Sequence, residues 1–405
     1  MIRAFLLLCL LMAPVAVADA PKVEFNDTER IVFLGNEFFD HERDQCYIET
    51  LLTTRFPDKN LIFRNLGYSG DNVWCDARTL CSGWDQFGPP EQGFERLKKL
   101  LGQIKPTLIF VAYGMNESFQ GETGLQHFRD GLNRVLDMLS ETGARVVLVS
   151  PIPHENLGPP LPDPAAHNRE LIAYTDVIRQ TAADRSMPFI NLLAGMAEQS
   201  PRAAGKALTS DGIHLTPIGY RKAAMLIERE IGDPARGWAI NLDAASGTVG
   251  TVGISVKDVS HHADRVAFSA TADILPVPLP APADEVPMIQ VRNLAPGQYS
   301  LRIDDRSVVT ATAPDWAIGV TIAAGPDADQ TEALRKLIVE KNFDFFNYWR
   351  PENDTYIFGY RKHEQGRNAV EIPRFEEMIP AKEAEIARLR APVSHSFVLE
   401  KTQRD

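Results

Sequence analysis

Five short apolar runs alternate with amphipathic stretches between Val23 and about Ile231, and this alternation limits the chain to few folds. Each run has the length of a buried strand, and glycine or polar residues that favour turns follow it. The runs are Ile31–Leu34, Leu61–Arg64, Thr107–Ala112, Arg145–Val149 and Pro188–Asn191. Such alternation predicts an α/β fold with a parallel sheet of about five strands between two layers of helices.

Two of the intervening stretches carry an apolar face with helical spacing. One face consists of Leu125, Phe128, Leu132, Val135, Leu136 and Leu139, and the other of Leu171, Tyr174, Val177 and Ile178. Right-handed crossovers between parallel strands place all the strand carboxyl ends on one rim of the sheet. We therefore expect functional residues to gather on that rim.

Four sequence blocks are expected on this rim. They read IVFLGNE (Ile31–Glu37), NLGYSGD (Asn65–Asp71), VAYGMNES (Val111–Ser118) and SDGIHLTPIGY (Ser210–Tyr220). The last block is the most specific, because an aspartate three residues before a histidine can accept the imidazole Nδ1–H. Asp211 would then fix the tautomer of His214 and leave its Nε2 free to act as a base.

In their order and spacing, these blocks resemble those of the SGNH, or GDSL-like, hydrolases. The resemblance extends from Ile31 to about Ile231 and implies a flavodoxin-like three-layer sandwich that hydrolyses esters, often acyl groups on carbohydrates or lipids. It implies that the Gly67 backbone N–H and the Asn116 side chain donate to the oxyanion. It also implies a small-molecule or polysaccharide ester substrate and no organic cofactor.

The first block departs from the family pattern, which reads Gly-Asp-Ser and ends on the nucleophile. Here the three residues are Gly35, Asn36 and Glu37. In one interpretation Glu37 is a nucleophile or a general base on water, or joins Asp211 and His214 around a divalent metal.

In a second interpretation a neighbouring hydroxyl from Ser69, Ser118 or Ser210 replaces the missing serine, although none lies at the elbow after the first strand. In a third, the chain is a catalytically silent binding module with the same fold. We favour a working hydrolase, because a pocket used only for binding has less need of an oriented imidazole.

Three further residues are expected to contribute binding contacts on the rim: Asn36, Met115 and His154. His154 lies in Pro151–Pro164, a proline-rich segment that cannot be helical throughout and follows a predicted strand. The segment is either a pocket wall or lid, or a rigid connection. Other catalytic motifs are absent from the sequence, including G-x-S-x-G, H-E-x-x-H and a glycine-rich phosphate loop.

The pattern changes after Asp233-Pro234. Gly247–Phe268 and Met288–Thr312 are rich in β-branched residues and glycine, which predicts a β-rich accessory module over residues 236–325. Residues 326–405 are predicted to form a helical tail whose aromatic residues pack back on the first domain, residues 21–235. Aromatic side chains at helical spacing favour a packed core over a ligand platform.

The first twenty residues have the pattern of a secretory signal, with Arg3, an apolar core at Ala4–Met12 and Ala18-Asp19-Ala20 as the cleavage site. We expect export to the periplasm or the cell exterior and no membrane span. A net charge of −12 disfavours nucleic acid as a general partner. In that compartment, a bridge between Cys75 and Cys81 is the expected disulfide.

Overall fold

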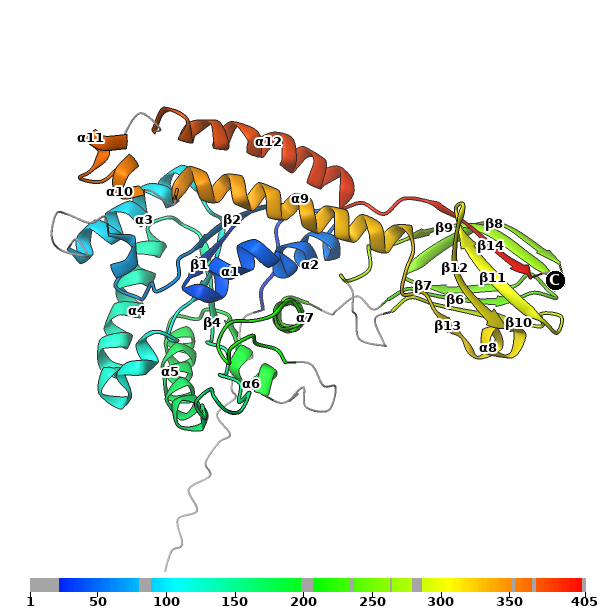
Figure 1. The fold of residues 1–405 in the computed structure, drawn as a ribbon, viewed down its shortest axis with the longest axis horizontal. Coiled ribbons are helices and arrows are strands. Elements are labelled where there is room, and N and C mark those ends of the chain that lie inside the picture. Colours follow the sequence, from blue (N-terminus) through cyan, green and yellow to red (C-terminus); the bar gives the residue numbers. More distant parts are fainter. Residues whose placement is uncertain are drawn as a thin grey trace, which may run out of the picture.

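The five predicted strands form one parallel sheet in this computed structural model (Figure 1). They are β1 (Thr28–Gly35), β2 (Asn60–Gly67), β3 (Leu108–Ala112), β4 (Arg145–Val149) and β5 (Phe189–Ile190), in the order β2-β1-β3-β4-β5. Gly35 is in register with both Gly67 and Ala112, so three neighbouring strands end at the same level. The flavodoxin-like α/β fold is confirmed.

The structure describes residues 22–79, 89–197, 207–232, 237–262, 264–278, 286–351, 354–365 and 369–402. The predicted signal segment, residues 1–20, lies outside these ranges, as does Cys81 of the expected disulfide.

Helices cover both faces of the parallel sheet. α1 (Glu37–Gln45), α2 (Tyr47–Arg55) and α7 (Pro217–Ile231) pack on one face. α3 (Pro90–Ile104), α4 (Leu125–Ser140) and α5 (Ala165–Asp184) pack on the other. α6 (Leu192–Ala197) follows β5, and three short 3₁₀ turns lie on the rim: η1 (Asp76–Arg78), η2 (Glu117–Gln120) and η3 (Glu122–Gly124).

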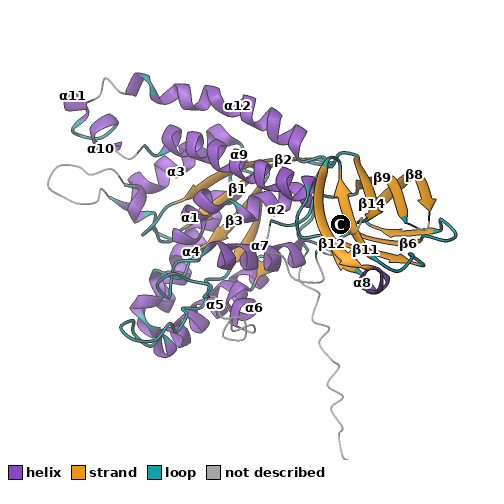
Figure 2. Cartoon of the chain, turned by 45° about the vertical axis from the view of Figure 1, so that its right-hand side comes forward, coloured by secondary structure: helices purple, strands orange, loops and turns teal. Residues whose placement is uncertain are grey.

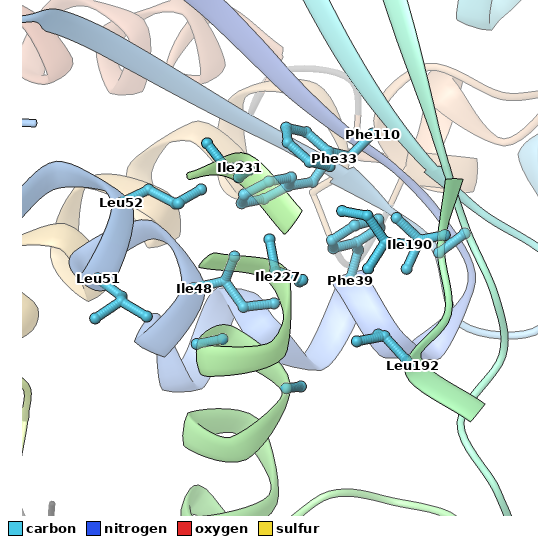
Figure 3. Close-up of a cluster of buried hydrophobic side chains, with 14 of the residues drawn as sticks. Phe33, Phe39, Ile48, Leu51, Leu52, Phe110, Ile190, Leu192, Ile227 and Ile231 are labelled. Carbon is cyan, nitrogen blue, oxygen red and sulfur yellow. The ribbon is translucent and has the colours of Figure 1, made fainter. Parts of the chain in front are cut away.

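Figure 3 shows how the first helical layer closes over the sheet. Phe33 of β1 stacks on Phe39 of α1 with ring centroids 4.8 Å apart, and Phe110 of β3 lies against Phe33. Ile227 of α7 belongs to the same cluster and is fully buried. Burial of each such side chain stabilises the fold by about 1.5–3 kcal/mol. This packing sets the start of α1, and with it the position of Glu37.

A two-sheet β module lies beside this α/β unit (Figures 1 and 2). One sheet has the order β13-β10-β6-β7 and the other β12-β11-β14-β9-β8, with a shared core between them. The strands are β6 (Ala239–Asp243), β7 (Val249–Val252), β8 (Ile254–His262), β9 (Arg265–Ala272), β10 (Met288–Arg292), β11 (Gln298–Ile303), β12 (Arg306–Thr312), β13 (Val320–Thr321) and β14 (His395–Lys401). α8 (Ala313–Ile318) follows β12.

The C-terminal helices return from the β module across the α/β unit. α9 (Pro326–Trp349) packs against α1, α2 and β2, and α12 (Ile372–Leu389) lies antiparallel along α9. Between them are α10 (Asp354–Ile357) and α11 (Lys362–Gln365). Phe345 and Trp349 are buried in the core cluster that includes β1 and α3, so these two aromatic residues serve packing.

The end of the chain differs from the predicted helical tail. β14 lies in the β module, where it pairs antiparallel with β11 on one side and with β9 on the other. Phe397 and Leu399 of this strand are buried in the module's core. Strand pairing of this kind joins residues 94 to 135 positions apart, so local pattern did not reveal it.

Candidate active site

The start of α1 is held at the rim by close contact between strands. A Cβ on Gly35 would lie 2.2 Å from the Ala112 carbonyl oxygen, so only glycine allows β1 and β3 to approach so closely here. Asn36 donates its backbone N–H to that carbonyl, and its side-chain oxygen accepts from Phe38 N–H as the helix cap. Glu37 is therefore the first residue of α1, where the positive end of the helix favours a carboxylate.

Asp211 and His214 form the pair that the sequence predicts. His214 Nδ1 lies 2.6 Å from Asp211 Oδ2, while Asp211 Oδ1 accepts the backbone N–H groups of Ile213 and His214. Burial raises the pKa of Asp211, but these hydrogen bonds outweigh it and lower the pKa to about 2. The carboxylate is thus ionised and oriented to stabilise an imidazolium.

Asn116 lies beside the first block. Its side-chain Nδ2 donates to Glu37 Oε2 at 3.1 Å and to the Asp71 backbone oxygen at 2.8 Å. An amide nitrogen carries two hydrogens, so both are engaged in this structure. The Glu37 carboxylate occupies one acceptor position that an oxyanion would otherwise take.

Gly67 is also engaged. Its backbone N–H donates to the Asn65 side-chain oxygen at 2.8 Å. A Cβ on Gly67 would lie 2.2 Å from the Asp40 nitrogen, so glycine is required where β2 meets α1. Close packing against α1 is thus sufficient to require glycine at position 67. For an oxyanion role, the Gly67 N–H would have to leave the Asn65 side-chain oxygen and donate to the substrate instead.

Four of the predicted residues line one pocket, namely Asn36, Glu37, Met115 and His214. Ala112, Ser150, Pro151, Ile152 and Tyr220 complete much of its wall. Gly67 and His154 are not among the lining residues that the described chain contributes. Pro151 and Ile152 do line the pocket, so the start of the proline-rich segment forms part of the pocket wall.

His41 is a pocket residue that the sequence interpretation missed. Its ring lies 5.0 Å from that of His214, centroid to centroid, with 27° between the planes. His41 follows Glu37 by four residues in α1, so the two share one helical face. That spacing is the signal that could have identified it.

The predicted binding residue His154 is next in sequence to Glu155, which is hydrogen-bonded to the Asp211–His214 turn. Its neighbour Glu155 donates its backbone N–H to the Gly212 carbonyl, and the Glu155 carboxylate accepts from Thr209 N–H and Oγ1. Burial and the nearby His167 and His214 lower the pKa of His154 to about 4. His154 is therefore a neutral neighbour of the Asp211–His214 turn at neutral pH.

A model of the GDSL-like lipase/acylhydrolase family matches residues 34–222, the stretch that holds all of these groups. This part of the chain is similar to that family. A search of curated proteins found no match.

Solved structures extend the likeness beyond this GDSL-like region. A gut microbial diltiazem-metabolizing enzyme is 18% identical, with a TM-score of 0.74 over 95% of this chain and 100% of its own. A catalytic mutant of an acetylxylan esterase from Geobacillus stearothermophilus is 18% identical with a TM-score of 0.40, over 51% of this chain and 95% of its own. The first of these shows that the β module and C-terminal helices belong to a shared fold.

None of the three candidate serines of the GDSL-like unit is arranged as a nucleophile. Ser69 Oγ donates to the Asp40 carboxylate at 2.6 Å, and buried Ser118 Oγ donates to the Met115 carbonyl at 2.6 Å. Ser210 Oγ donates to the His214 carbonyl at 3.3 Å. Each hydroxyl proton faces an acceptor that is not the His214 imidazole, which disfavours the hydroxyl interpretation.

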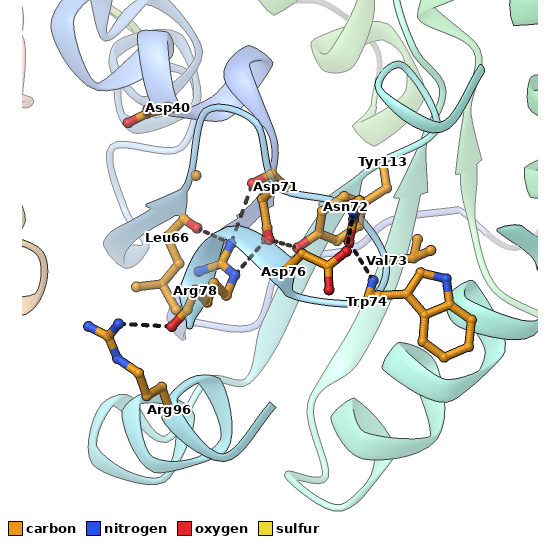
Figure 4. A network of polar contacts seen from close by, with 12 residues as sticks. Asp40, Leu66, Asp71, Asn72, Val73, Trp74, Asp76, Arg78, Arg96 and Tyr113 are labelled. Carbon is orange, nitrogen blue, oxygen red and sulfur yellow. Dashed lines mark hydrogen bonds and ion pairs between the residues drawn. The ribbon is translucent and has the colours of Figure 1, made fainter. Parts of the chain in front are cut away.

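A buried ionic network connects the segments that follow β2 and β3 (Figure 4). Arg78 donates to Asp71 Oδ2 at 2.6 Å and to the Leu66 carbonyl at 2.8 Å, and Tyr113 donates its hydroxyl to the same Asp71 oxygen at 2.8 Å. Burial would lower the pKa of Arg78, but Asp71 outweighs it and raises the pKa. Because the Asp71 backbone oxygen also accepts from Asn116, this network positions Asn116.

In the part of the chain that the structure describes, no three His, Cys, Asp or Glu side chains come together as a metal site. The cluster of Glu37, Asp211 and His214 suggested as a metal site is therefore not assembled. Across the same residues, no helix is both long and apolar enough to span a membrane.

Proposed function

We propose that the protein hydrolyses ester bonds in the pocket between α1 and the Asp211–His214 turn, with His214 as the general base. The observation that carries this proposal is the 2.6 Å contact between Asp211 Oδ2 and His214 Nδ1 at a pocket also lined by Glu37. The match of residues 34–222 to the GDSL-like lipase/acylhydrolase family supports ester chemistry.

In the proposed reaction, His214 Nε2 removes a proton from water while the water oxygen bonds to the ester carbonyl carbon. The tetrahedral intermediate then releases the alcohol oxygen, which takes the proton back from the imidazolium. Asp211 stabilises the imidazolium throughout. The products are the free acid and the alcohol, and water is the only other reactant that the reaction consumes.

We assign Glu37 the task of holding the attacking water beside His214. Its carboxylate lies in the same pocket and is itself held by Asn116 at 3.1 Å. Displacement of Glu37 from Asn116 by the substrate would free one amide hydrogen for the developing oxyanion. A carboxylate attacking the ester directly is the competing role, and labelled water separates the two.

Hydrolysis of short-chain acyl esters tests the proposal. We expect His214→Ala and Glu37→Ala to lose about 10²–10⁴-fold in kcat, the usual contribution of a positioned acid or base. Asp211→Asn should fall by about 10²-fold or more, because the imidazole loses its oriented acceptor. A wild-type protein active on esters and unaffected by His214→Ala would contradict the proposed base.

A single turnover in H₂¹⁸O distinguishes the two roles of Glu37. If Glu37 holds water, the label enters the acid product directly and the α1 peptide remains unlabelled. If Glu37 attacks the carbonyl carbon, the alcohol leaves first and a mixed anhydride remains on Glu37. Water that opens this anhydride at the Glu37 carboxyl carbon releases the acid with a Glu37 oxygen and leaves ¹⁸O on Glu37, which mass spectrometry detects. Opening at the acyl carbon leaves Glu37 unlabelled, so the acyl-Glu37 adduct is also sought after rapid quenching. Chelator should leave the rate unchanged.

The second candidate function is a catalytically silent binding module. It is favoured by one observation, that the Asn116 amide hydrogens and the Gly67 N–H are all engaged within the protein. If the wild-type protein does not hydrolyse esters, the Glu37→Ser variant is assayed in the same way to distinguish the hydrolase from the binding module. Gain of hydrolysis by that variant would mean that the base and pocket are intact but that the natural chain lacks this chemistry.

We further propose that the protein acts after export, on the basis of the signal pattern in residues 1–20. Amino-terminal sequencing of protein from cell fractions tests this. The expected mature chain begins near Pro21 and is found outside the cytoplasm, and an intact chain in the cytoplasm would contradict it.

A further inference from the structure

The two oxyanion donors that the family pattern implies are both engaged within the protein. The Gly67 N–H is bonded to the Asn65 side chain, and both hydrogens of the Asn116 amide have acceptors. In the proposed reaction, Asn116 releases one of them only after Glu37 moves away. A donor that needs no rearrangement would stabilise the oxyanion as soon as it forms, which is where such donors contribute most to the rate.

His41 is a pocket side chain with an N–H to donate. It is half-buried and lines the pocket together with His214. Among the residues that the structure describes, neither nitrogen of the His41 ring has a hydrogen-bond partner. Glu37 lies one turn earlier on α1, but its carboxylate is bonded to Asn116 rather than to His41. Because a neutral imidazole keeps one N–H, His41 has a hydrogen for a ligand.

The other side-chain donors of the pocket are less suited to this task. The hydroxyl groups of Tyr113, Ser150 and Tyr220 each donate to an oxygen of the protein. Asn36 is only 2% exposed, and its side-chain oxygen accepts the Phe38 N–H at the start of α1. This hydrogen bond limits how far the Asn36 amide can turn toward a ligand.

The His41 ring lies beside the proposed base. The centroids of the His41 and His214 rings are 5.0 Å apart, with 27° between the ring planes. Asp211 holds His214 through Nδ1, which leaves Nε2 for the attacking water. With hydrogen bonds of about 2.7–3.1 Å, two rings at this separation can reach two oxygens on one carbon. These are the oxygen of the attacking water and the former carbonyl oxygen.

We infer that His41 is a catalytic residue whose ring N–H donates a hydrogen bond to the oxyanion of the tetrahedral intermediate. The inference rests on the proposed function, since this intermediate forms in ester hydrolysis. No proton leaves His41, so the proton transfers among water, His214 and the alcohol are unchanged. A neutral donor also adds no charge beside the His214 imidazolium, whereas a second imidazolium would repel it.

Two variants of His41 separate donation from stacking. His41→Phe keeps a ring beside His214 but removes the N–H, whereas His41→Gln removes the ring and keeps an amide N–H. With p-nitrophenyl acetate, His41→Phe should lose about 10²–10³-fold in kcat at little changed KM, because the hydrogen bond is made only in the transition state. His41→Gln should be about tenfold more active than His41→Phe, because it retains a neutral donor.

His127→Phe is the matched control. His127 on α4 also stacks on an aromatic ring, that of Trp74 at 4.6 Å, but it is not among the pocket-lining residues of the described chain. We expect this variant to keep the wild-type kcat. Full activity of His41→Phe would overturn the donor role. Higher activity of His41→Phe than of His41→Gln would also overturn it, and would show that His41 supports His214 by stacking.

The leaving group distinguishes an oxyanion donor from a general acid. p-Nitrophenolate leaves without being protonated, whereas the ethanol oxygen of ethyl acetate takes up a proton as it leaves. An oxyanion forms with both esters, so His41→Phe should lower kcat by a similar factor for each. A loss confined to ethyl acetate would overturn the inference in favour of proton transfer from His41 to the alcohol.

A stable tetrahedral anion separates failure of this inference from failure of the proposed function. If wild type is an active esterase and His41→Phe is unimpaired, only the donor role fails. If wild type hydrolyses neither ester, the proposed function fails, and ethyl methylphosphonate is titrated into the full chain and followed by ³¹P NMR. Binding about tenfold weaker in His41→Phe than in wild type would support His41 as a donor to a tetrahedral oxyanion. Equal binding by the two proteins, or no binding by wild type, would overturn it.

Discussion

At the residue scale, His154 is the most informative titratable group outside the Asp211–His214 pair. Its imidazole is buried beside His167 and His214, and these surroundings lower its pKa from 6.5 to about 4. An unfolded chain would bind a proton at this residue below pH 6.5, whereas the folded chain would not until about pH 4. The unfolded state therefore binds more protons between these values, and stability falls as the pH falls.

Replacement of His154 should remove this acid sensitivity. We expect wild type to lose up to about 3 kcal/mol of unfolding free energy relative to His154→Gln between pH 6.5 and pH 4, from 1.36 kcal/mol per pKa unit. Above pH 7 the difference between the two proteins should be constant. Urea unfolding of both proteins at a series of pH values measures this difference in unfolding free energy. A difference that stays constant from pH 7 to pH 4 would contradict the lowered pKa of His154.

At the element scale, α9 is joined to α2 by a buried ion pair. Lys341 donates to Glu49 Oε1 at 2.6 Å and to the Phe63 carbonyl at 3.2 Å, and Asn342 donates to the other Glu49 oxygen at 2.8 Å. Both Lys341 and Glu49 are almost inaccessible. Arg350, the residue just after this helix, reaches Asp40 of α1 at 3.1 Å, so α9 braces the two helices that follow β1.

Removing only one charge of this ion pair should destabilise the fold much more than removing both charges together. Lys341→Met leaves the Glu49 carboxylate buried without its cation and should cost about 3–5 kcal/mol of unfolding free energy. Adding Glu49→Gln should recover a large part of that loss in a double-mutant cycle. Arg388→Met removes an exposed pair with Glu385 and serves as the control, with a loss of about 1 kcal/mol or less.

At the scale of the whole molecule, the chain enters the β module after α7, leaves it for α9 and α12, and returns to it as β14 (Figure 1). The module has a core of its own, in which Phe397 of β14 stacks on Phe268 at 5.0 Å. The pocket lies in the other unit, whose core clusters share none of these residues.

Loss of Phe397 should therefore affect the two parts unequally. Phe397→Ala is expected to destabilise the β module by about 3–5 kcal/mol, the usual cost of a buried phenylalanine. Hydrogen exchange should speed up in β9, β11 and β14 and stay unchanged in β1–β4. Val393→Ala, at a half-exposed position just before β14, is the control. Equal acceleration in β1–β4 would show instead that the two cores unfold together.

Periodicity was sufficient to predict the parallel sheet and its two helical layers. Each of the five predicted strands overlaps an observed one, because runs such as Thr107–Ala112 are buried on both faces and have no other stable environment. The β14 strand was not predicted, because its partners β9 and β11 are far away in the sequence.

The sequence by itself determined the α/β architecture and the Asp211–His214 pair, because both depend on local spacing along the chain. Only the tertiary structure decided that Asn116 is engaged by Glu37, that His41 joins the pocket and that Phe119 stacks on His167. Each of these contacts joins segments separated by many residues or depends on the direction of a side chain. Packing of the whole chain sets such directions, and local propensity carries no information about them.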